Sequence, residues 1–327
     1  MMKRAVFILP LISVLFLTFA SCGQKYFTSD GQAWATLYHI VYLSPRDLAD
    51  SISKEIEAVN DELSLFNPLS ELSAVNDGTT DSIGIRFADV FGLSRYVWEI
   101  SGSVYDPTIG PVAELWGFGR SENAIPTDSA VEKALEAVGM GECSIRGNRI
   151  VKKSPATRFD FSSVAKGYGV DCIADMMERN GVENYMIEIG GEVLARGVNP
   201  KGRAWHIQID SPEGGMEHKP LGIKALGPDR TALATSGNYR NIRTDSLGRR
   251  YGHTLSPLTG RPAETSVVSA TVESSSCALA DALATACMAS GCADSAMAII
   301  ARSGCEALIV EARGDTLAIV STPDFKF

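Results

Sequence analysis

The sequence is poor in the residues that zinc centres and nucleic-acid-binding surfaces require. It holds only four histidines, His39, His206, His218 and His253, and none falls in an H-E-x-x-H motif or close to a cysteine, so we expect no zinc site. Acidic residues outnumber basic ones by 39 to 30, and the net charge of −9 disfavours nucleic-acid binding. A nucleotide ligand stays possible, because a local cationic patch or a bound cation can hold its phosphates.

Two phosphate-binding motifs and one redox motif are also absent. The chain contains neither G-x-G-x-x-G nor G-x-x-x-x-G-K-[ST], which argues against Rossmann and P-loop chemistry. No C-x-x-C pair occurs, and most cysteines after Cys22 sit among apolar residues, so we interpret them as small buried side chains. The sequence leaves open whether one disulfide forms among the six cysteines after Cys22, which are Cys143, Cys172, Cys277, Cys287, Cys292 and Cys305.

Long hydrophobic runs are missing except at the N-terminus. Lys3 and Arg4 precede an apolar stretch, and the small residues before Cys22 resemble a bacterial lipobox. We therefore expect residues 1–21 to be a lipoprotein signal peptide, residues 22–30 a tether that starts at a lipidated Cys22, and residues 31–327 a catalytic domain. The mature protein would be anchored on the periplasmic side of a bacterial membrane. A plain secretory signal or a single membrane anchor is the alternative.

The hydrophobic periodicity predicts an α+β fold with mixed or antiparallel sheets and packed helices, since hairpin patterns alternate with amphipathic helical ones. A Gly-Gly pair at 190–191 predicts a tight hairpin turn. Helices are expected at 46–66, 87–101, 127–138, 165–180, 277–290 and 293–302, and strands at 33–43, 145–151, 158–161, 185–189, 192–195, 205–210, 231–235, 267–272, 307–311 and 317–320.

The run at residues 158–171 indicates an anion-binding site. It reads as a short strand that turns into a helix, with Asp160, Ser162 and Ser163 at the turn and Lys166 in the first helical turn. Unpaired N–H groups and the positive end of the helix dipole favour phosphates at such a place, and Lys166 adds a positive charge. An ordinary serine-capped helix is the alternative.

The helix expected at 277–290 carries Asp281 and Thr285 four residues apart, on one face, among alanines and leucines. An unpaired carboxylate in such surroundings is costly to bury, and a cation is one remedy. A carboxylate, a hydroxyl and a further oxygen suit Mg²⁺. The alternative is an aspartate that hydrogen-bonds to a neighbouring loop.

Further candidates lie in two loop regions. Phe66, Tyr105 and Trp116 could form an aromatic wall for a planar heterocycle, although scattered aromatic residues are commonly core. Asp106 could contact a ligand or start a turn. His253, in a polar loop, could accept a proton near neutral pH or have no role.

Taken in order, several segments resemble the FAD:protein FMN transferases, the ApbE family, from about residue 33 to the C-terminus. The agreement of many short motifs in one order makes the resemblance specific. The segments lie at 63–66 with 70–73, 105–108 through 115–119, 160–171, 187–192, 234–237, 253–257 with 259–262, and 280–285.

The resemblance implies a role for individual residues. His253 would be the general base, and Trp34 and Ser256 depart from the family pattern. Positions Phe66, Val104, Tyr105, Asp106, Asp160, Lys166 and Leu255 would contact FAD, while Ser163, Asp281 and Thr285 would hold Mg²⁺, with Asp281 also counted as catalytic.

The resemblance also implies an activity and a partner. It implies an ApbE-like fold with a flavin cleft between two lobes, and Mg²⁺-dependent transfer of the FMN half of FAD to a threonine of an exported protein, with release of AMP. The acceptor would carry a D-[SG]-[AG]-T-like motif, as in a subunit of an Rnf-type or sodium-pumping quinone reductase complex. Two alternatives are a metal-dependent FAD pyrophosphatase and an FAD-binding lipoprotein without turnover.

Overall fold

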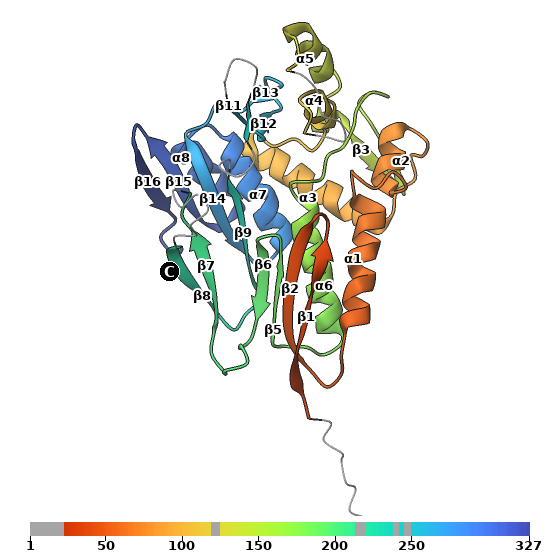
Figure 1. The fold of residues 1–327 in the computed structure, drawn as a ribbon. Helices are drawn as coiled ribbons and strands as arrows, with labels where there is room; N and C mark the ends of the chain where they lie inside the picture. The colour runs from red at the N-terminus through yellow and green to blue at the C-terminus, as the bar shows by residue number, and fades with distance from the viewer. Residues whose placement is uncertain (1–22, 119–124, 213–219, 238–241, 245–249) are drawn as a thin grey trace, which may run out of the picture.

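The computed structural model describes residues 23–118, 125–212, 220–237, 242–244 and 250–327, so the predicted signal peptide and Cys22 lie outside the described residues. Its centre is an eight-stranded sheet in which every neighbouring pair is antiparallel (Figure 1). In spatial order the strands are β1 (Lys25–Ala33), β2 (Thr36–Ser44), β5 (Tyr185–Ile189), β6 (Glu192–Arg196), β9 (Thr231–Gly237), β14 (Val267–Ser274), β15 (Glu306–Arg313) and β16 (Thr316–Ser321).

Strand β1 corrects the expected tether at residues 22–30. It pairs with β2 over nine residue pairs, from Lys25 with Ser44 to Ala33 with Thr36. The turn between them is tight, because Trp34 and Ala35 both adopt positive φ angles. Residues 25–30 therefore belong to the folded domain, since their backbone groups bond to β2.

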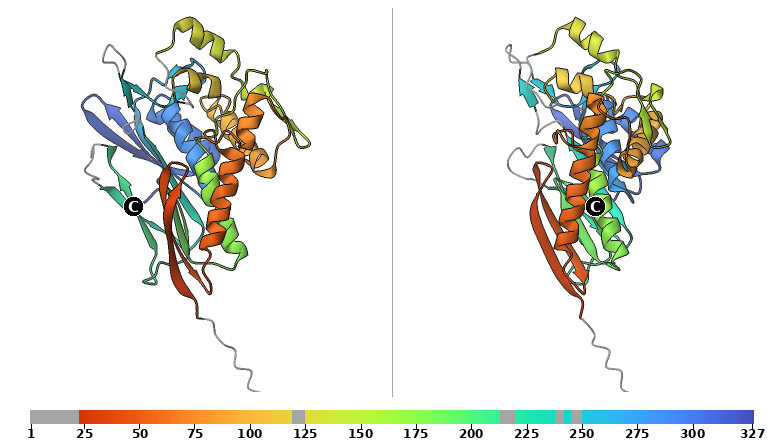
Figure 2. Two further views of the ribbon diagram at one scale, coloured as in Figure 1. Left: turned by 45° about the vertical axis from the view of Figure 1, so that its right-hand side comes forward. Right: turned by 90° about the vertical axis from the view of Figure 1, so that its right-hand side faces the viewer.

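Helices cover one face of the sheet, as the two rotated views show (Figure 2). Side chains alternate along each strand, so that Tyr185, Ile187 and Ile189 of β5 all point to the helical side and are fully buried. The helices of this layer are α1 (Ala49–Leu63), α3 (Ile85–Ser101), α6 (Ala165–Arg179), α7 (Cys277–Ala289) and α8 (Ala293–Ser303).

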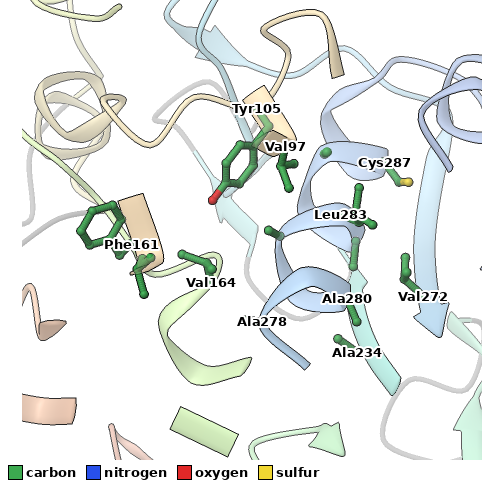
Figure 3. Packing of buried hydrophobic residues seen from close by; sticks show 14 of the residues in the cluster. Val97, Tyr105, Phe161, Val164, Ala234, Val272, Ala278, Ala280, Leu283 and Cys287 are labelled. Atoms are coloured by element: carbon green, nitrogen blue, oxygen red, sulfur yellow. The ribbon is translucent and has the colours of Figure 1, made fainter. Parts of the chain in front are cut away.

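Helix α7 lies in the middle of the core. Its neighbours include β14, β9, α6, α8 and α3. Its many alanines let these elements approach closely, and Ala280 and Leu283 have no exposed surface (Figure 3). The side chain of Ser276 caps its N-terminus by accepting from the N–H of Leu279.

The other sheet face is covered in part by a separate hairpin of β7 (Trp205–Asp210) and β8 (Pro220–Leu226). Trp205, Ile209 and Leu226 of this hairpin pack on Leu233 and Leu308 of the sheet. The described residues contain no helix long and apolar enough to cross a bilayer. The remaining elements are α2 (Glu71–Asp77), α4 (Gly110–Leu115), α5 (Asp128–Leu135), η1 (Met140–Glu142), β3 (Ser144–Arg146), β4 (Arg149–Val151), β10 (Ile242–Thr244), β11 (Arg250–Gly252), β12 (Leu255–Ser256) and β13 (Arg261–Pro262).

The prediction of a strand at residues 158–161 is wrong. Only an isolated bridge between Arg158 and Ile109 forms there. The backbone N–H and C=O of Phe159 instead bond to the side chain of Asn76, at 2.7 and 2.8 Å. An amide side chain thus replaces a neighbouring strand, while Phe159 and Phe161 are buried among other aromatic rings.

Candidate functional site

A cleft of about 830 Å³ opens between the Gly190–Gly191 turn, the start of α6, and the loops around residues 104–118 and 253–257. Nearly all the predicted site residues line it, although they come from four separate parts of the chain. Those that do are Val104, Tyr105, Asp106, Asp160, Ser163, Lys166, His253, Leu255, Asp281 and Thr285.

Two aspartates form hydrogen bonds between α6 and α7. Asp171 of α6 accepts from the backbone N–H groups of Cys277 and Ala278, each at 3.0 Å, and so caps α7 together with Ser276. In return, Oδ2 of Asp281 in α7 accepts from the N–H of Gly167 in α6 at 3.1 Å. Each helix N-terminus therefore receives a carboxylate from the other helix, and the positive end of the helix dipole stabilises this negative charge.

Gly167 is required for this close approach. A Cβ atom there would lie 2.4 Å from the backbone oxygen of Cys277 and 2.8 Å from the Cα of Ala278. Both obstacles are backbone atoms, which cannot rotate away. Any larger residue would separate the two helices and lengthen the bond to Asp281.

The serine cap that was the alternative interpretation of the start of α6 does not form. The N-cap residue of α6 is Val164, whose side chain makes no capping hydrogen bond. At the start of α6, the N–H of Ala165 instead bonds to the carbonyl of Phe161, and the N–H of Gly167 bonds to the carboxylate of Asp281. The helix N-terminus therefore binds an anion that the protein itself supplies, and this segment reaches the cleft through the side chains of Ser163 and Lys166.

Lys166 lies between two buried carboxylates. Its Nζ forms an ion pair with Oε1 of Glu192, whose side chain is 5% exposed. Burial alone would lower the pKa of Lys166, but the charges of Asp281 and Glu192 outweigh this and hold the pKa above its ordinary value. Burial raises the pKa of both Glu192 and Asp281, and their mutual proximity adds to the shift at Glu192. The cation is therefore fixed in place by its partners.

Glu192 is the site residue that sequence reasoning missed. Its second carboxylate oxygen, Oε2, is buried and has no hydrogen-bond partner among the described residues. Such an atom is rare in a folded protein and indicates strain or an unfilled ligand position. The signal was present in the Glu-Ile-Gly-Gly-Glu run that ends at Glu192, but a glutamate after a hairpin turn ordinarily faces solvent.

Tyr105 and Ser163 connect the loop at 104–108 to the start of α6. The hydroxyl of Ser163 donates to that of Tyr105 at 3.2 Å, and Ser94 contacts the same phenol at 3.3 Å. Burial raises the pKa of Tyr105 to about 12, so the phenol stays neutral and can donate. The side chain of Asp160 accepts from the N–H of Ser162 at 2.9 Å and thereby shapes the turn.

Asp106 fits the turn interpretation. Its Oδ1 accepts from the N–H and hydroxyl of Thr108, at 2.8 and 2.5 Å, and its Oδ2 accepts from the N–H of Met140 at 3.1 Å. Burial raises its pKa, against the effect of these bonds. The carboxylate therefore holds the loop that presents Val104 and Tyr105 to the cleft.

The predicted aromatic wall does not form. Phe66 is 65% exposed and does not line the cleft. It lies in the loop after α1, where the hydroxyl of Ser64 accepts from the backbone N–H groups of Phe66 and Asn67. Trp116 is buried beside α5, and its indole N–H bonds to the carbonyl of Gly260 at 2.7 Å. Tyr105 remains on the wall, and Phe118 is an aromatic residue there that was not predicted.

His253 and Leu255 reach the cleft from a small hairpin formed by β12 and β13. The bond between Trp116 and Gly260 ties this hairpin to α4, which follows the Tyr105 loop. Both residues are partly exposed. Exposure of His253 fits its predicted role, because a proton acceptor must reach the incoming substrate.

The oxygens at this site fit a hard divalent cation. Asp281, Thr285 and Ser163 offer one carboxylate and two hydroxyls along the same cleft, and such ligands suit Mg²⁺. In the described part of the chain no three His, Cys, Asp or Glu side chains form a metal-binding group. A cation would thus depend on one carboxylate, the hydroxyls, water and a ligand's phosphates, and one or two carboxylates with water and phosphates are the usual ligands of Mg²⁺ in proteins.

Comparisons with known proteins agree on one family. A model described as the ApbE family matches residues 34–309. The FAD:protein FMN transferase of Vibrio cholerae serotype O1 is 36% identical over 272 residues, which cover 80% of each protein. The FAD:protein FMN transferase of Haemophilus influenzae is 33% identical over 288 residues, which cover 82% of each of the two proteins.

Solved structures agree as well. The flavin transferase ApbE from Vibrio cholerae superimposes with a TM-score of 0.83 at 32% identity, over 93% of this chain and 99% of that one. The apo form of the Pseudomonas stutzeri flavinyl transferase ApbE gives a TM-score of 0.81 at 29% identity, over 92% of this chain and 96% of that one. The similarity therefore extends over the α+β domain and includes every element that lines the cleft.

Proposed function

The chain belongs to the ApbE family, and from this premise we propose that it is an FAD:protein FMN transferase. The observation that carries the proposal is the meeting of Lys166, Asp281, Thr285 and Ser163 in one cleft at the start of α6. This cleft offers a cation and hard oxygens, the latter suited to Mg²⁺, for the diphosphate of FAD.

The residues of the cleft would divide the substrate between them. Lys166, fixed by Glu192, would face a phosphate of the diphosphate. Tyr105 and Val104 would form the wall for the rest of the dinucleotide, and Leu255 would close it from the opposite hairpin. Ser163, Asp281 and Thr285 would hold Mg²⁺, which when bound neutralises charge on the phosphates.

The chemistry is displacement at phosphorus. The hydroxyl oxygen of an acceptor threonine forms a bond to the phosphorus of the FMN half, and the bond from that phosphorus to the bridging oxygen breaks. AMP leaves with the bridging oxygen and the electron pair of the broken bond. His253 accepts the proton of the hydroxyl, and Lys166 stabilises the negative charge that collects on the phosphates.

We further propose that the acceptor is an exported protein with a D-[SG]-[AG]-T-like motif, of the kind found in Rnf-type or sodium-pumping quinone reductase complexes. The lipobox-like sequence before Cys22 supports anchoring of the enzyme on the periplasmic side of a bacterial membrane.

Replacement of Asp281 tests the proposal. The protein is incubated with FAD, Mg²⁺ and an acceptor domain that carries an Asp-Gly-Ala-Thr segment. We expect covalent flavin on the acceptor and AMP in equal amounts, and a loss of at least about 100-fold in Asp281→Ala. Asp324→Ala, at a carboxylate that is 79% exposed, is the control and should match the wild type.

The same incubation separates the alternatives. Free FMN without labelled acceptor would identify a pyrophosphatase, and unchanged FAD would identify a carrier protein. Full transfer by Asp281→Ala would show that the metal and the phosphates lie elsewhere.

A further inference from the structure

A second cavity of about 300 Å³ lies on the sheet face that the helices do not cover. It joins the cleft, since both are lined by the same four residues at the junction. These shared residues are Gly191, Gln208, Ile209 and Thr235.

One wall of this cavity is the edge of strand β7. Four consecutive residues of β7, from His206 to Ile209, line it, whereas no residue of β8 does. Strand β7 pairs with β8 along one edge, and it has no other strand partner within the described residues. The edge that faces the cavity therefore offers a row of backbone N–H and C=O groups about 3.3 Å apart per residue.

The floor consists of outward-pointing side chains of the central sheet. Met186 and Leu233 contribute an apolar surface, and Thr235 and Thr271 share a hydrogen bond of 2.9 Å between their hydroxyls. His39 also lines the cavity, with its Nδ1 2.5 Å from Oδ1 of Asp30, and Glu188 accepts from the N–H of Gly191 at 2.8 Å. Among the residues that the structure describes, no lysine or arginine lines this cavity. The floor thus suits small and aliphatic side chains and gives a phosphate no reason to bind.

We propose that this groove binds an extended segment of the acceptor protein, which adds as a strand to the free edge of β7 and so leads its hydroxyl residue into the cleft. The inference rests on the proposed function, because the groove continues directly into the cleft where the flavin would be transferred. Pairing along a strand edge supplies backbone hydrogen bonds, and the floor selects the side chains that alternate toward it.

The groove is tested with Met186→Trp, which fills the floor without touching the cleft. With the Asp-Gly-Ala-Thr acceptor domain, we expect the KM for the acceptor to rise at least about tenfold and the Kd for FAD to stay within about twofold. Ile223→Trp is the matched control. Ile223 lies on β8 of the same hairpin, is 54% exposed and does not line the groove, so the KM should not change.

A cross-linking measurement covers the case that Met186→Trp does not fold. A photoreactive phenylalanine analogue at the exposed position 206 should capture the acceptor domain close to its threonine, and the same analogue at position 223 should not. If the wild type transfers FMN but Met186→Trp keeps the wild-type KM, or if position 206 captures no acceptor, the groove inference is wrong. If the wild type transfers no FMN, the proposed function is wrong and the inference falls with it.

Discussion

At the scale of single residues, the site is defined by one cation among buried carboxylates. Lys166 does not stand alone at the helix start. Instead Glu192 holds its Nζ and Asp281 adds a second negative charge from α7. Because the three groups lie in a largely desolvated place, the removal of one changes the free energy of the other two.

Replacement of Lys166 should therefore affect stability in a non-additive way. Lys166→Met leaves Glu192 and Asp281 facing each other without a cation, and we expect a loss of about 2 kcal/mol, reduced from the fully buried case because the lysine is partly exposed. The double variant with Glu192→Gln should recover at least half of that loss. Urea unfolding at pH 7 measures both. Equal losses in the single and double variants would contradict the coupling.

At the scale of elements, the contact between α6 and α7 places the functional groups. Two reciprocal carboxylate caps and a glycine contact fix the register of these helices, so that Asp281 meets the start of α6. Periodicity and capping residues predicted both helices, because an amphipathic pattern reports burial along a single element. They could not predict that the helices cap each other, since Asp171 and Cys277 are far apart in the sequence.

Gly167→Ala tests this contact. The new methyl group would meet the backbone of Cys277 and Ala278, so we expect a loss of about 2 kcal/mol in unfolding free energy and weaker binding of FAD. Gly92→Ala in α3 is the matched control. Nothing lies within 4 Å of its added methyl group, and alanine should stabilise that helix by up to about 1 kcal/mol. Equal stabilities of the two variants would show that α6 and α7 can separate without penalty.

At the scale of the whole molecule, predictions failed where tertiary contacts replaced a local rule. The hairpins at 185–195 and 306–321 and most helices were predictable, because their side-chain patterns match their burial. Strand β1 was missed because it lies at the edge of the sheet, where Ala33 alone of its nine residues is buried. Phe66 lies in the loop after α1 and outside the cleft lining, and its aromatic side chain alone does not indicate on which side of this loop it lies.

The missed strand β1 leads to a prediction about the proposed membrane anchor. Only Gly23 and Gln24 separate Cys22 from Lys25, the first residue of β1. The strand then runs nine residues, about 30 Å, to Ala33. Its hairpin partner at Leu37 bonds to Gly190 at the cleft, so the cleft lies at the opposite end of β1 from the proposed lipid. A short tether would thus hold the cleft about 30 Å above the bilayer.

Lengthening this tether should change activity only toward acceptors in the same membrane. Ten glycine and serine residues inserted between Gln24 and Lys25 would add about 18 Å of flexible reach and release the domain from its fixed height. In proteoliposomes we expect several-fold slower flavinylation of a membrane-embedded acceptor, because its effective concentration at the cleft falls. The rate with a soluble acceptor domain should stay within about twofold. Cys22→Ser, which cannot carry the lipid, should remain in the soluble fraction and lose the advantage of the membrane-embedded acceptor altogether. If the insertion leaves the ratio of the two rates unchanged, the tether does not set the height of the cleft.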